Sequence, residues 1–363
     1  MYRAPISAMK SIDGPIELLS MSDAASYRHL LEVRDLETQF HTDFGVIRAV
    51  DGIDLHIDEG ETVGLVGESG CGKSVAALSI VRLVPDPPGR IVNGQVLFEG
   101  QDLLQLGIRD MRHVRGAKIG IIFQEPLTSL NPVLSIERQI VEPLQEHLGM
   151  TRQRASLRAE ELLDMVGIPD PSARMKDYPH MMSGGQRQRI MIAIALSCNP
   201  RLLIADEATT ALDVTIQAQI LELMKDLTER FGTALLMITH NLGVVARYAD
   251  RVCVMYAGKI REMAPSEELY GNPRHPYTLG LLGSVPRLDA PRESGKLAQV
   301  PGDVPDPTLM PAGCAFHPRC DYAVALCGVE DPGMEEVGDG HGVACWEWER
   351  VGSNRVGQEI AQP

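Results

Sequence analysis

The stretch that decides the fold is Gly67-Glu68-Ser69-Gly70-Cys71-Gly72-Lys73-Ser74. Its glycines, lysine and hydroxyl residue have the spacing of a phosphate-binding loop. The apolar residues 62–66 before it predict a buried strand, and residues 75–81 after it predict a helix. Glycine lets successive N–H groups converge on phosphate oxygens, and the helix N-terminus adds its positive end. We therefore expect a nucleoside triphosphate site, where Lys73 reaches the β- and γ-phosphates and Ser74 binds magnesium. A chance glycine-rich turn is the weaker alternative.

Length and composition bound the class of protein. The chain has 363 residues, enough for one large core and a second small module, so we expect two domains. Its hydrophobic fraction is 44%, and no apolar run approaches the roughly 18 residues that cross a bilayer, so any membrane role is expected to be peripheral. The charged N-terminal residues do not have the pattern of a secretory signal. A net charge of −15 argues against a broad nucleic-acid surface.

A pair of carboxylates follows a second apolar run. Residues 202–205 predict a buried strand, and Asp206 and Glu207 come directly after it. Asp206 is expected to hold magnesium through water or Ser74, and Glu207 to orient or deprotonate an attacking water. Structural acids at a strand end are the alternative interpretation.

Two more predicted strands end in polar residues. Residues 119–122 lead to Gln124, and residues 234–239 lead to His240. Gln124 would touch magnesium or the attacking water, and His240 would contact the γ-phosphate. In isolation, such residues are more often ordinary strand-end or structural side chains.

A second phosphate-binding feature is expected at Ser183-Gly184-Gly185-Gln186. Ser183 and the glycines would expose backbone donors at the start of a helix over residues 187–197. Residues 135–180 before it are expected to be mostly helical. Upstream of the phosphate loop, Phe44 either stacks on an adenine or is a core or turn aromatic.

Cys71 lies inside the phosphate loop, beside Lys73 and a helix N-terminus. This environment tends to lower the pKa of a thiol, so we expect maleimide to block the site and a bound nucleotide to protect it. A small residue that only fills space is the alternative.

Four cysteines crowd a proline- and glycine-rich C-terminal segment: Cys314, Cys320, Cys327 and Cys345. In a reducing compartment, such a cluster indicates metal before disulfide. It lacks the pair roughly two to four residues apart that structural zinc sites usually show. Zinc, an iron–sulfur cluster and free or oxidised thiols remain open, with His317 and His341 as alternate ligands.

Together, the motifs from residue 31 to residue 262 resemble the nucleotide-binding subunit of an ABC transporter. The resemblance implies an α/β fold: a P-loop ABC ATPase domain with a mixed sheet core and a helical insertion subdomain, plus a small Cys-containing C-terminal region. The domains it implies are a loose extension (1–29), the ATPase domain (30–263, with the helical insertion about 125–185), the C-terminal region (264–350) and a tail (351–363).

The resemblance also implies roles for individual residues. It makes residues 67–74 the Walker A loop, Gln124 the Q-loop, residues 183–186 the signature, and Asp206 and Glu207 Walker B. It further makes Asp213 the D-loop acid, His240 the switch histidine and Phe44 the adenine-stacking residue. Met182 stands where leucine is usual and Ala208 where proline is common, and neither departure removes a catalytic group.

Residues 123–132, 209–214, 274–278 and the cysteine-containing tail narrow the likeness to oligopeptide and dipeptide importers. This subfamily implies ATP hydrolysis with Mg, a second and paralogous ABC ATPase subunit, two permease subunits and an extracytoplasmic peptide-binding protein. It implies a peripheral position on the cytoplasmic face of the inner membrane, and a 4Fe-4S cluster on the four tail cysteines. A nickel or other small-solute importer, or a soluble ABC ATPase outside transport, is the alternative.

Overall fold

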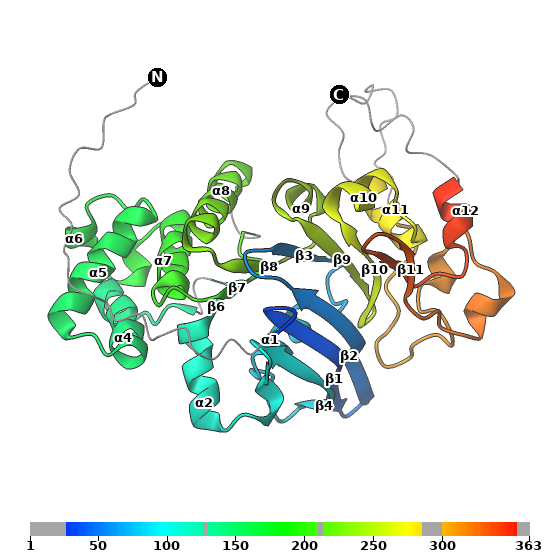
Figure 1. Cartoon of the computed structure of the whole chain (residues 1–363), viewed down its shortest axis with the longest axis horizontal. Helices are drawn as coiled ribbons and strands as arrows, with labels where there is room; N and C mark the ends of the chain where they lie inside the picture. Colours follow the sequence, from blue (N-terminus) through cyan, green and yellow to red (C-terminus); the bar gives the residue numbers. More distant parts are fainter. Residues whose placement is uncertain (1–26, 126–128, 210–212, 285–299, 354–363) are drawn as a thin grey trace, which may run out of the picture.

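Two sheets organise the chain, and helices cover them (Figure 1). The computed structural model describes residues 27–125, 129–209, 213–284 and 300–353. Most of the extension expected over residues 1–29 therefore lies outside the described residues, as do residues 354–363 of the tail. The predicted α/β class with a mixed sheet core is confirmed.

The larger sheet has eight strands in the order β11-β12-β10-β9-β3-β8-β7-β6. Strands β9, β3, β8, β7 and β6 run parallel, whereas β10, β12 and β11 join by antiparallel pairing. The bounds are β3 (Thr62–Val66), β6 (Ile119–Ile122), β7 (Leu202–Asp206), β8 (Ala234–Thr239), β9 (Arg251–Tyr256), β10 (Lys259–Pro265), β11 (Glu335–Gly338) and β12 (His341–Val343).

The parallel strands are apolar in their interiors because both faces of the sheet are buried, and polar residues such as Asp206 and Arg251 stand only at strand ends. In β7, Leu202 and Ile204 belong to one apolar core, and Leu203 and Ala205 belong to the other. This alternation follows from the two-residue repeat of a strand. Because β6, β7 and β8 pair in parallel, their carboxyl ends lie side by side at one edge, where polar residues follow.

The smaller sheet is antiparallel, in the order β2-β1-β4-β5, and α1 contacts both sheets (Figure 1). Its strands are β1 (Leu31–Thr42), β2 (Gly45–Ile57), β4 (Gly89–Phe98) and β5 (Gln101–Asp102), and the helix is α1 (Lys73–Ile80). Ala76 and Ile80 of α1 are fully buried in the core that joins the sheets. The helix after the phosphate loop is thereby fixed on two sides.

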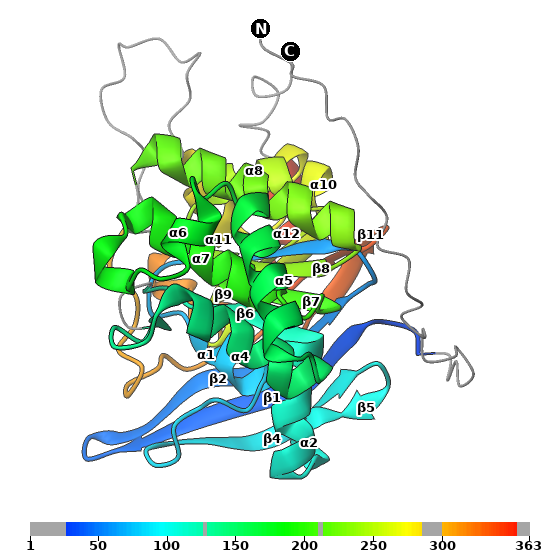
Figure 2. The same ribbon diagram turned by 90° about the vertical axis from the view of Figure 1, so that its left-hand side faces the viewer.

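A helical lobe lies at one end of the molecule (Figures 1 and 2). Its helices are α4 (Ile136–Leu148), α5 (Arg152–Met165), α6 (Pro171–Arg174) and α7 (Gly184–Leu196), and α2 (Ile108–His113) lies before it in the chain. Side chains of Ser135 and Thr151 cap α4 and α5 by accepting N–H bonds, and Gly149 ends α4 in the left-handed conformation. These caps explain why two helices form where the sequence predicts helix.

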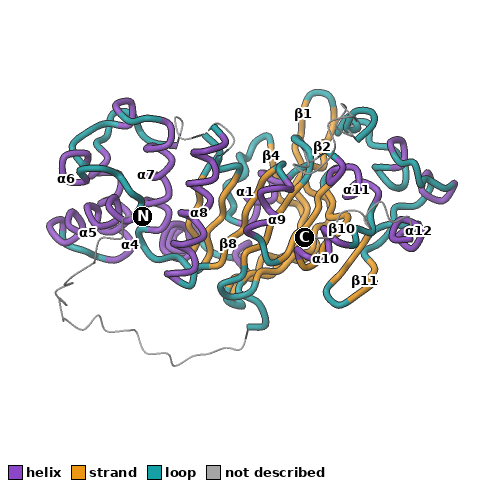
Figure 3. Tube along the Cα trace, turned by 90° about the horizontal axis from the view of Figure 1, so that it is seen from above, coloured by secondary structure: helices purple, strands orange, loops and turns teal. Residues whose placement is uncertain are grey.

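The C-terminal region lies at the opposite end from the helical lobe (Figures 1 and 3). The remaining helices are α8 (Val214–Phe231), α9 (Leu242–Tyr248), α10 (Ser266–Gly271), α11 (Pro276–Gly283) and α12 (Trp348–Ser353). Strand β12 pairs with β10 through Glu262 and Val343, so this region extends the main sheet. Within the described ranges, no helix combines the length and apolarity needed to span a bilayer.

Candidate nucleotide site

The phosphate loop connects β3 to α1 and depends on glycine. Gly72 has a φ of 108°, and a Cβ there would lie 2.1 Å from the carbonyl oxygen of Ala49. Gly72 also precedes the first turn of α1 without a side-chain cap, so the amides of that turn remain available to an anion. The Lys73 Nζ donates to the carbonyl oxygens of Gly67 and Glu68 over 2.8 and 2.9 Å. The Lys73 side chain therefore folds back over the phosphate loop, and two carbonyl oxygens of that loop hold its ammonium group.

The hydroxyl and the first carboxylate of the site meet directly. The Ser74 Oγ donates to the Asp206 Oδ1 over 2.9 Å, across 132 residues of sequence. Burial raises the pKa of the Asp206 carboxyl, while the bond from Ser74 lowers it. A hydroxyl and a carboxylate oxygen are hard ligands of the kind that magnesium prefers. This part of the chain thus offers a donor set that fits Mg²⁺.

Glu207 follows β7 and contacts polar residues that follow the two neighbouring strands, β6 and β8. The Gln124 Nε2 donates to Glu207 Oε2 over 3.0 Å, and the His240 Nδ1 lies 3.4 Å from Glu207 Oε1. Glu207 has a φ of 45°, which is unusual for a residue other than glycine and indicates local strain. The polar residues predicted after β6, β7 and β8 are therefore brought together around one carboxylate.

The Ser183–Gln186 segment starts α7 in the helical lobe. Ser183 Oγ accepts from the Gln186 backbone N–H over 3.3 Å, and Gln186 Oε1 accepts from the Ser183 N–H over 3.0 Å. This reciprocal capping box occupies the Gln186 side chain, whereas Ser183 and Gly184 remain exposed. Gly185 is half-buried, and a Cβ there would lie 3.1 Å from the Ile216 Cγ2. The segment presents its helix start at the surface.

Phe44 and Asp213 lie outside these contacts. Phe44 is 90% exposed on the turn between β1 and β2, so it is not a core aromatic. Asp213 caps α8 by accepting the Ile216 N–H over 2.9 Å. Residues 210–212, which precede it, lie outside the described residues. Ser69 and Gly70 belong to the exposed part of the phosphate loop, and a Cβ at Gly70 would meet open space.

Cys71 corrects one expectation. Its side chain is 1% exposed, and burial raises the pKa of the thiol, although Lys73 opposes the rise. The expected lowering of the pKa is therefore wrong, because an apolar environment penalises the thiolate more than one ammonium stabilises it. The alternative, a small side chain that fills the space beside Gly67, describes the residue as the structure shows it.

The C-terminal cysteines converge on one small cavity, lined by Cys314, Cys320, Cys327 and Cys345. Burial raises the pKa of Cys320 to about 11 and of Cys345 to about 12. Within the described ranges, no three of these sulfurs lie within 4.8 Å of one another. Tetrahedral zinc, with Zn–S bonds of about 2.3 Å, would bring its sulfurs to roughly 4 Å. The four sulfurs therefore do not have the spacing of a zinc site.

The two histidines considered as alternate ligands differ in position. His317 lines the cysteine cavity, with its Nδ1 2.9 Å from the carbonyl oxygen of Cys314. His341 instead lies 2.9 Å from the Glu262 carboxylate and pairs with Glu268. His341 is therefore committed to carboxylates between β10, β12 and α10.

Sequence reasoning missed the contacts between the phosphate loop and the C-terminal region. The Glu68 carboxylate, expected only as part of the loop, forms a bidentate ion pair with Arg319. This pair raises the pKa of Arg319. The Glu68 backbone N–H donates to the Tyr277 hydroxyl. The one sequence feature that draws attention to Arg319 is its position between two tail cysteines, and that feature does not indicate a contact with the phosphate loop.

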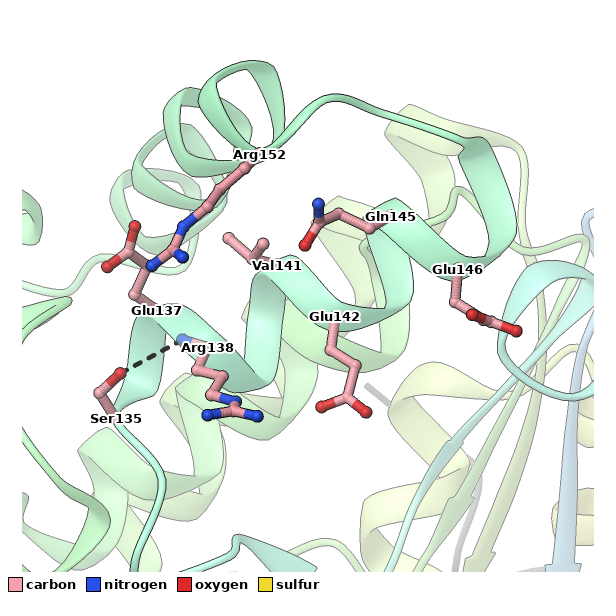
Figure 4. Close-up of a pocket in the computed structure, with 8 residues that line it drawn as sticks. All are labelled: Ser135, Glu137, Arg138, Val141, Glu142, Gln145, Glu146 and Arg152. Carbon is pink, nitrogen blue, oxygen red and sulfur yellow. Dashed lines mark hydrogen bonds between the residues drawn. The ribbon is translucent and has the colours of Figure 1, made fainter.

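An open hollow of about 760 Å³ lies on the helical lobe (Figure 4). Its lining carries both charges: Ser135, Glu137, Arg138, Val141, Glu142, Gln145, Glu146 and Arg152. These side chains come from the start and length of α4 and from the start of α5 (Figure 4). The hollow is separate from the strand ends that carry the predicted nucleotide residues.

Comparison with known proteins bears directly on this arrangement. Residues 50–210 match the family described as "ABC transporter", and residues 261–327 match "Oligopeptide/dipeptide transporter, C-terminal region". The oligopeptide transport ATP-binding protein OppD of Bacillus subtilis is 52% identical over 87% of this chain and 88% of its own length. The dipeptide transport ATP-binding protein DppD of Bacillus subtilis is 48% identical over 87% of this chain and 94% of its own length.

Solved structures support the same conclusion. The ATP-binding cassette MJ0796, described as a dimer in a post-hydrolysis state bound to ADP and Pi, is 28% identical to this chain. The match has a TM-score of 0.59 and covers 65% of this chain and 98% of that one. Fold, site geometry and sequence agree: the chain is an ABC-type ATPase and belongs to the ABC transporter ATP-binding proteins that carry the oligopeptide/dipeptide C-terminal region.

Proposed function

We propose that this chain hydrolyses ATP to energise the import of dipeptides or oligopeptides through a membrane permease. The observation that carries the proposal is the meeting of Ser74 with Asp206, and of Gln124 and His240 with Glu207, beside the phosphate loop. Relatives named for oligopeptide and dipeptide transport support the peptide assignment. The same relatives do not favour the alternatives, which are import of nickel or another small solute and a soluble ATPase role outside transport.

The residues of the site divide the work of phosphoryl transfer. Lys73 and the amides of residues 67–74 bind the phosphates, and Ser74, Asp206 and Gln124 would hold magnesium, which would supply positive charge to neutralise the charge that develops on the phosphates. Glu207 accepts a proton from water, or orients it, as the water approaches the γ-phosphate. His240 donates toward the γ-phosphate. Because the catalytic groups act mainly by position and charge, their mutual contacts matter for the rate.

We further propose that the nucleotide lies between two ATPase subunits. The exposed start of α7 is well suited to receive phosphate from a partner's loop, since its capping box uses the N–H groups of Ser183 and Gln186 but not those of Gly184 and Gly185. Gly185, Gln186 and Asp213 belong to the same composite site, and exposed Phe44 stacks on adenine. The partner is a paralogous cassette.

The helical lobe is the proposed contact with the two permease subunits. Gln124 touches Glu207, and its neighbour Phe123 and nearby Val133 are apolar side chains exposed to 39% and 76%. Elsewhere on the lobe, the hollow along α4 carries charges that a permease segment can pair with (Figure 4). Nucleotide state at Glu207 would reach the permease through Gln124. The permease in turn receives peptide from an extracytoplasmic binding protein.

The four tail cysteines are proposed to hold a 4Fe-4S cluster, with zinc as the alternative. The support is their convergence on one cavity. A cluster bound there would cross-link a segment that has little regular structure. The Cys314 backbone N–H already donates a hydrogen bond to the Cys327 carbonyl oxygen over 2.9 Å. The proposed domains are 30–263 for the ATPase, with its helical insertion about 125–185, and 264–350 for the C-terminal region.

Uptake by cells that lack this chain tests the proposal. Labelled dipeptide and oligopeptide uptake should fall, and should return with the parent chain but not with Glu207→Gln. Nickel uptake serves as the specificity control. Loss of nickel uptake with intact peptide uptake would support the alternative solute instead.

A further inference from the structure

The second residue of the phosphate loop is bonded to the C-terminal region. The Glu68 backbone N–H donates to the Tyr277 hydroxyl oxygen over 2.8 Å, across 209 positions of sequence. The Arg319 Nη1 and Nη2 donate to the two Glu68 carboxylate oxygens over 2.8 and 3.0 Å, across 251 positions. Both the backbone and the side chain of one loop residue are therefore held from outside the ATPase motifs.

Arg319 is itself held in place. Its side chain is 4% exposed. Its Nε donates to the Pro301 carbonyl over 2.8 Å, and Nη1 also donates to the Tyr256 hydroxyl over 3.3 Å. The guanidinium lies 5.9 Å from the centre of the Phe316 ring. An arginine bonded on several sides keeps one orientation, so its bidentate pair with a carboxylate has a defined direction.

The aromatic residues around Arg319 form a rigid surface. The ring centres of Tyr256 and Tyr277 lie 4.7 Å apart, and the Phe316 ring lies 5.2 and 5.3 Å from them. All three side chains are buried. Closely packed rings have little freedom to move, and so the Tyr277 hydroxyl is a fixed acceptor.

These contacts bear on the phosphate loop in two ways. The Lys73 ammonium rests on the carbonyl oxygens of Gly67 and Glu68, so the backbone position of Glu68 sets the position of that ammonium. Glu68 also places a negative charge in a loop that receives a triphosphate. Arg319 compensates that charge, because an ion pair with bidentate geometry neutralises a carboxylate locally.

We propose that Arg319 and Tyr277 are positioning residues for ATP binding: they hold Glu68 in place, and Arg319 neutralises its carboxylate beside the phosphates. The C-terminal region thereby becomes part of the ATP site without touching the nucleotide. The proposal rests on the assignment of the loop to ATP. It deepens that assignment by naming residues that determine ATP affinity.

The test measures ATP affinity of the full-length chain by calorimetry, and kcat and KM in the complex with the permease. Arg319→Ala should weaken ATP binding about tenfold and raise KM similarly, because it leaves a carboxylate unpaired beside the phosphates. The kcat should stay within about threefold, since Glu207 and its partners are untouched.

Charge removal provides the decisive comparison. The double variant Glu68→Gln with Arg319→Ala should regain most of the lost affinity, since no unpaired charge remains. Arg319→Lys, which keeps charge but not the bidentate geometry, should fall between the parent and Arg319→Ala. Arg158→Ala is the matched control, because Arg158 pairs with Glu161 over 3.0 Å on the helical lobe. It should leave ATP affinity at the parent value.

Two results would overturn the inference. One is a folded Arg319→Ala chain that binds ATP as the parent does. The other is a double variant as impaired as the single one, which would indicate a general structural defect. A parent chain that binds no ATP would instead reject the proposed function of the loop, so the two failures are distinguishable.

Discussion

The strand-end edge and the C-terminal contact with the phosphate loop are built in opposite ways. At the strand ends, the His240 side chain is 47% exposed and bonds to Glu207 over a long 3.4 Å. At the C-terminal contact, the Arg319 side chain is 4% exposed and bonds to Glu68 over 2.8 Å. The first arrangement leaves groups accessible to a nucleotide and water. The C-terminal contact is buried and closely bonded, so it can hold the phosphate loop in place beside the strand-end residues.

The largest effect is expected at the strand ends. Glu207→Gln removes the charge that polarises water, so kcat should fall by about 10³-fold. ATP affinity should stay within about threefold, because Lys73 and Ser74 still bind the phosphates. The measurement is ATPase rate and calorimetric affinity of the same preparation. Glu229→Gln, on the exposed surface of α8, is the control. Normal ATP turnover in Glu207→Gln would show that Glu207 has no role in hydrolysis.

Loop geometry should produce the next effect. Gly72→Ala forces a Cβ to within 2.1 Å of the Ala49 carbonyl, so the loop must shift and ATP affinity should fall about 30-fold or more. Gly70→Ala shares the positive φ but meets no atom within 4 Å, and is the matched control. It should lose less than about fivefold. Equal losses in both variants would show that close approach at Gly72 is not what shapes the loop.

The prediction for the cysteine cavity concerns the iron and sulfide content of the chain and not its ATPase rate. Chain purified without oxygen should contain iron and labile sulfide, and Cys345→Ser should lose most of both. Cys198→Ser, whose buried thiol contacts the Pro143 carbonyl of α4, should keep them. The readout is metal and sulfide analysis with visible absorption. Zinc without sulfide would reject the cluster and favour the alternative metal.

The smallest effect concerns Cys71. Because burial raises the pKa of its thiol, the thiolate fraction at neutral pH should be lower than for a free cysteine, and should rise only as the pH becomes alkaline. Maleimide should therefore label Cys71 slowly in the folded chain and rapidly after unfolding, as peptide mass spectrometry would show. Fast labelling at neutral pH that ATP prevents would restore the expectation of a reactive thiol.

Much of the strand-end region was predictable because its signals are local. A glycine-rich loop after a strand, or Asp206 and Glu207 after another, can be recognised from adjacent residues. Parallel strands also end at one edge, and that explains why Gln124 and His240 could be expected near Glu207. The structure places both within hydrogen-bonding range of it.

The C-terminal contact was not predictable by the same reasoning. Nothing near Glu68 in sequence indicates a partner 251 positions away, since the pairing depends on how β9, α11 and the tail pack together. Cys71 failed for a related reason: neighbouring charge is visible in the sequence, whereas burial is not, and burial decides the direction of its pKa.

Peptide-dependent ATP hydrolysis tests the central claim most directly. The chain, its partner cassette and the permease subunits would be placed in liposomes with the peptide-binding protein, and ATP consumption and peptide uptake would be followed together. Peptide should stimulate ATP hydrolysis, uptake should require ATP on the side of the cassettes, and Glu207→Gln should abolish both. The account would be contradicted if peptide did not change the rate of ATP hydrolysis. It would also be contradicted if peptide uptake continued when this chain carried Glu207→Gln and the partner cassette carried the equivalent substitution.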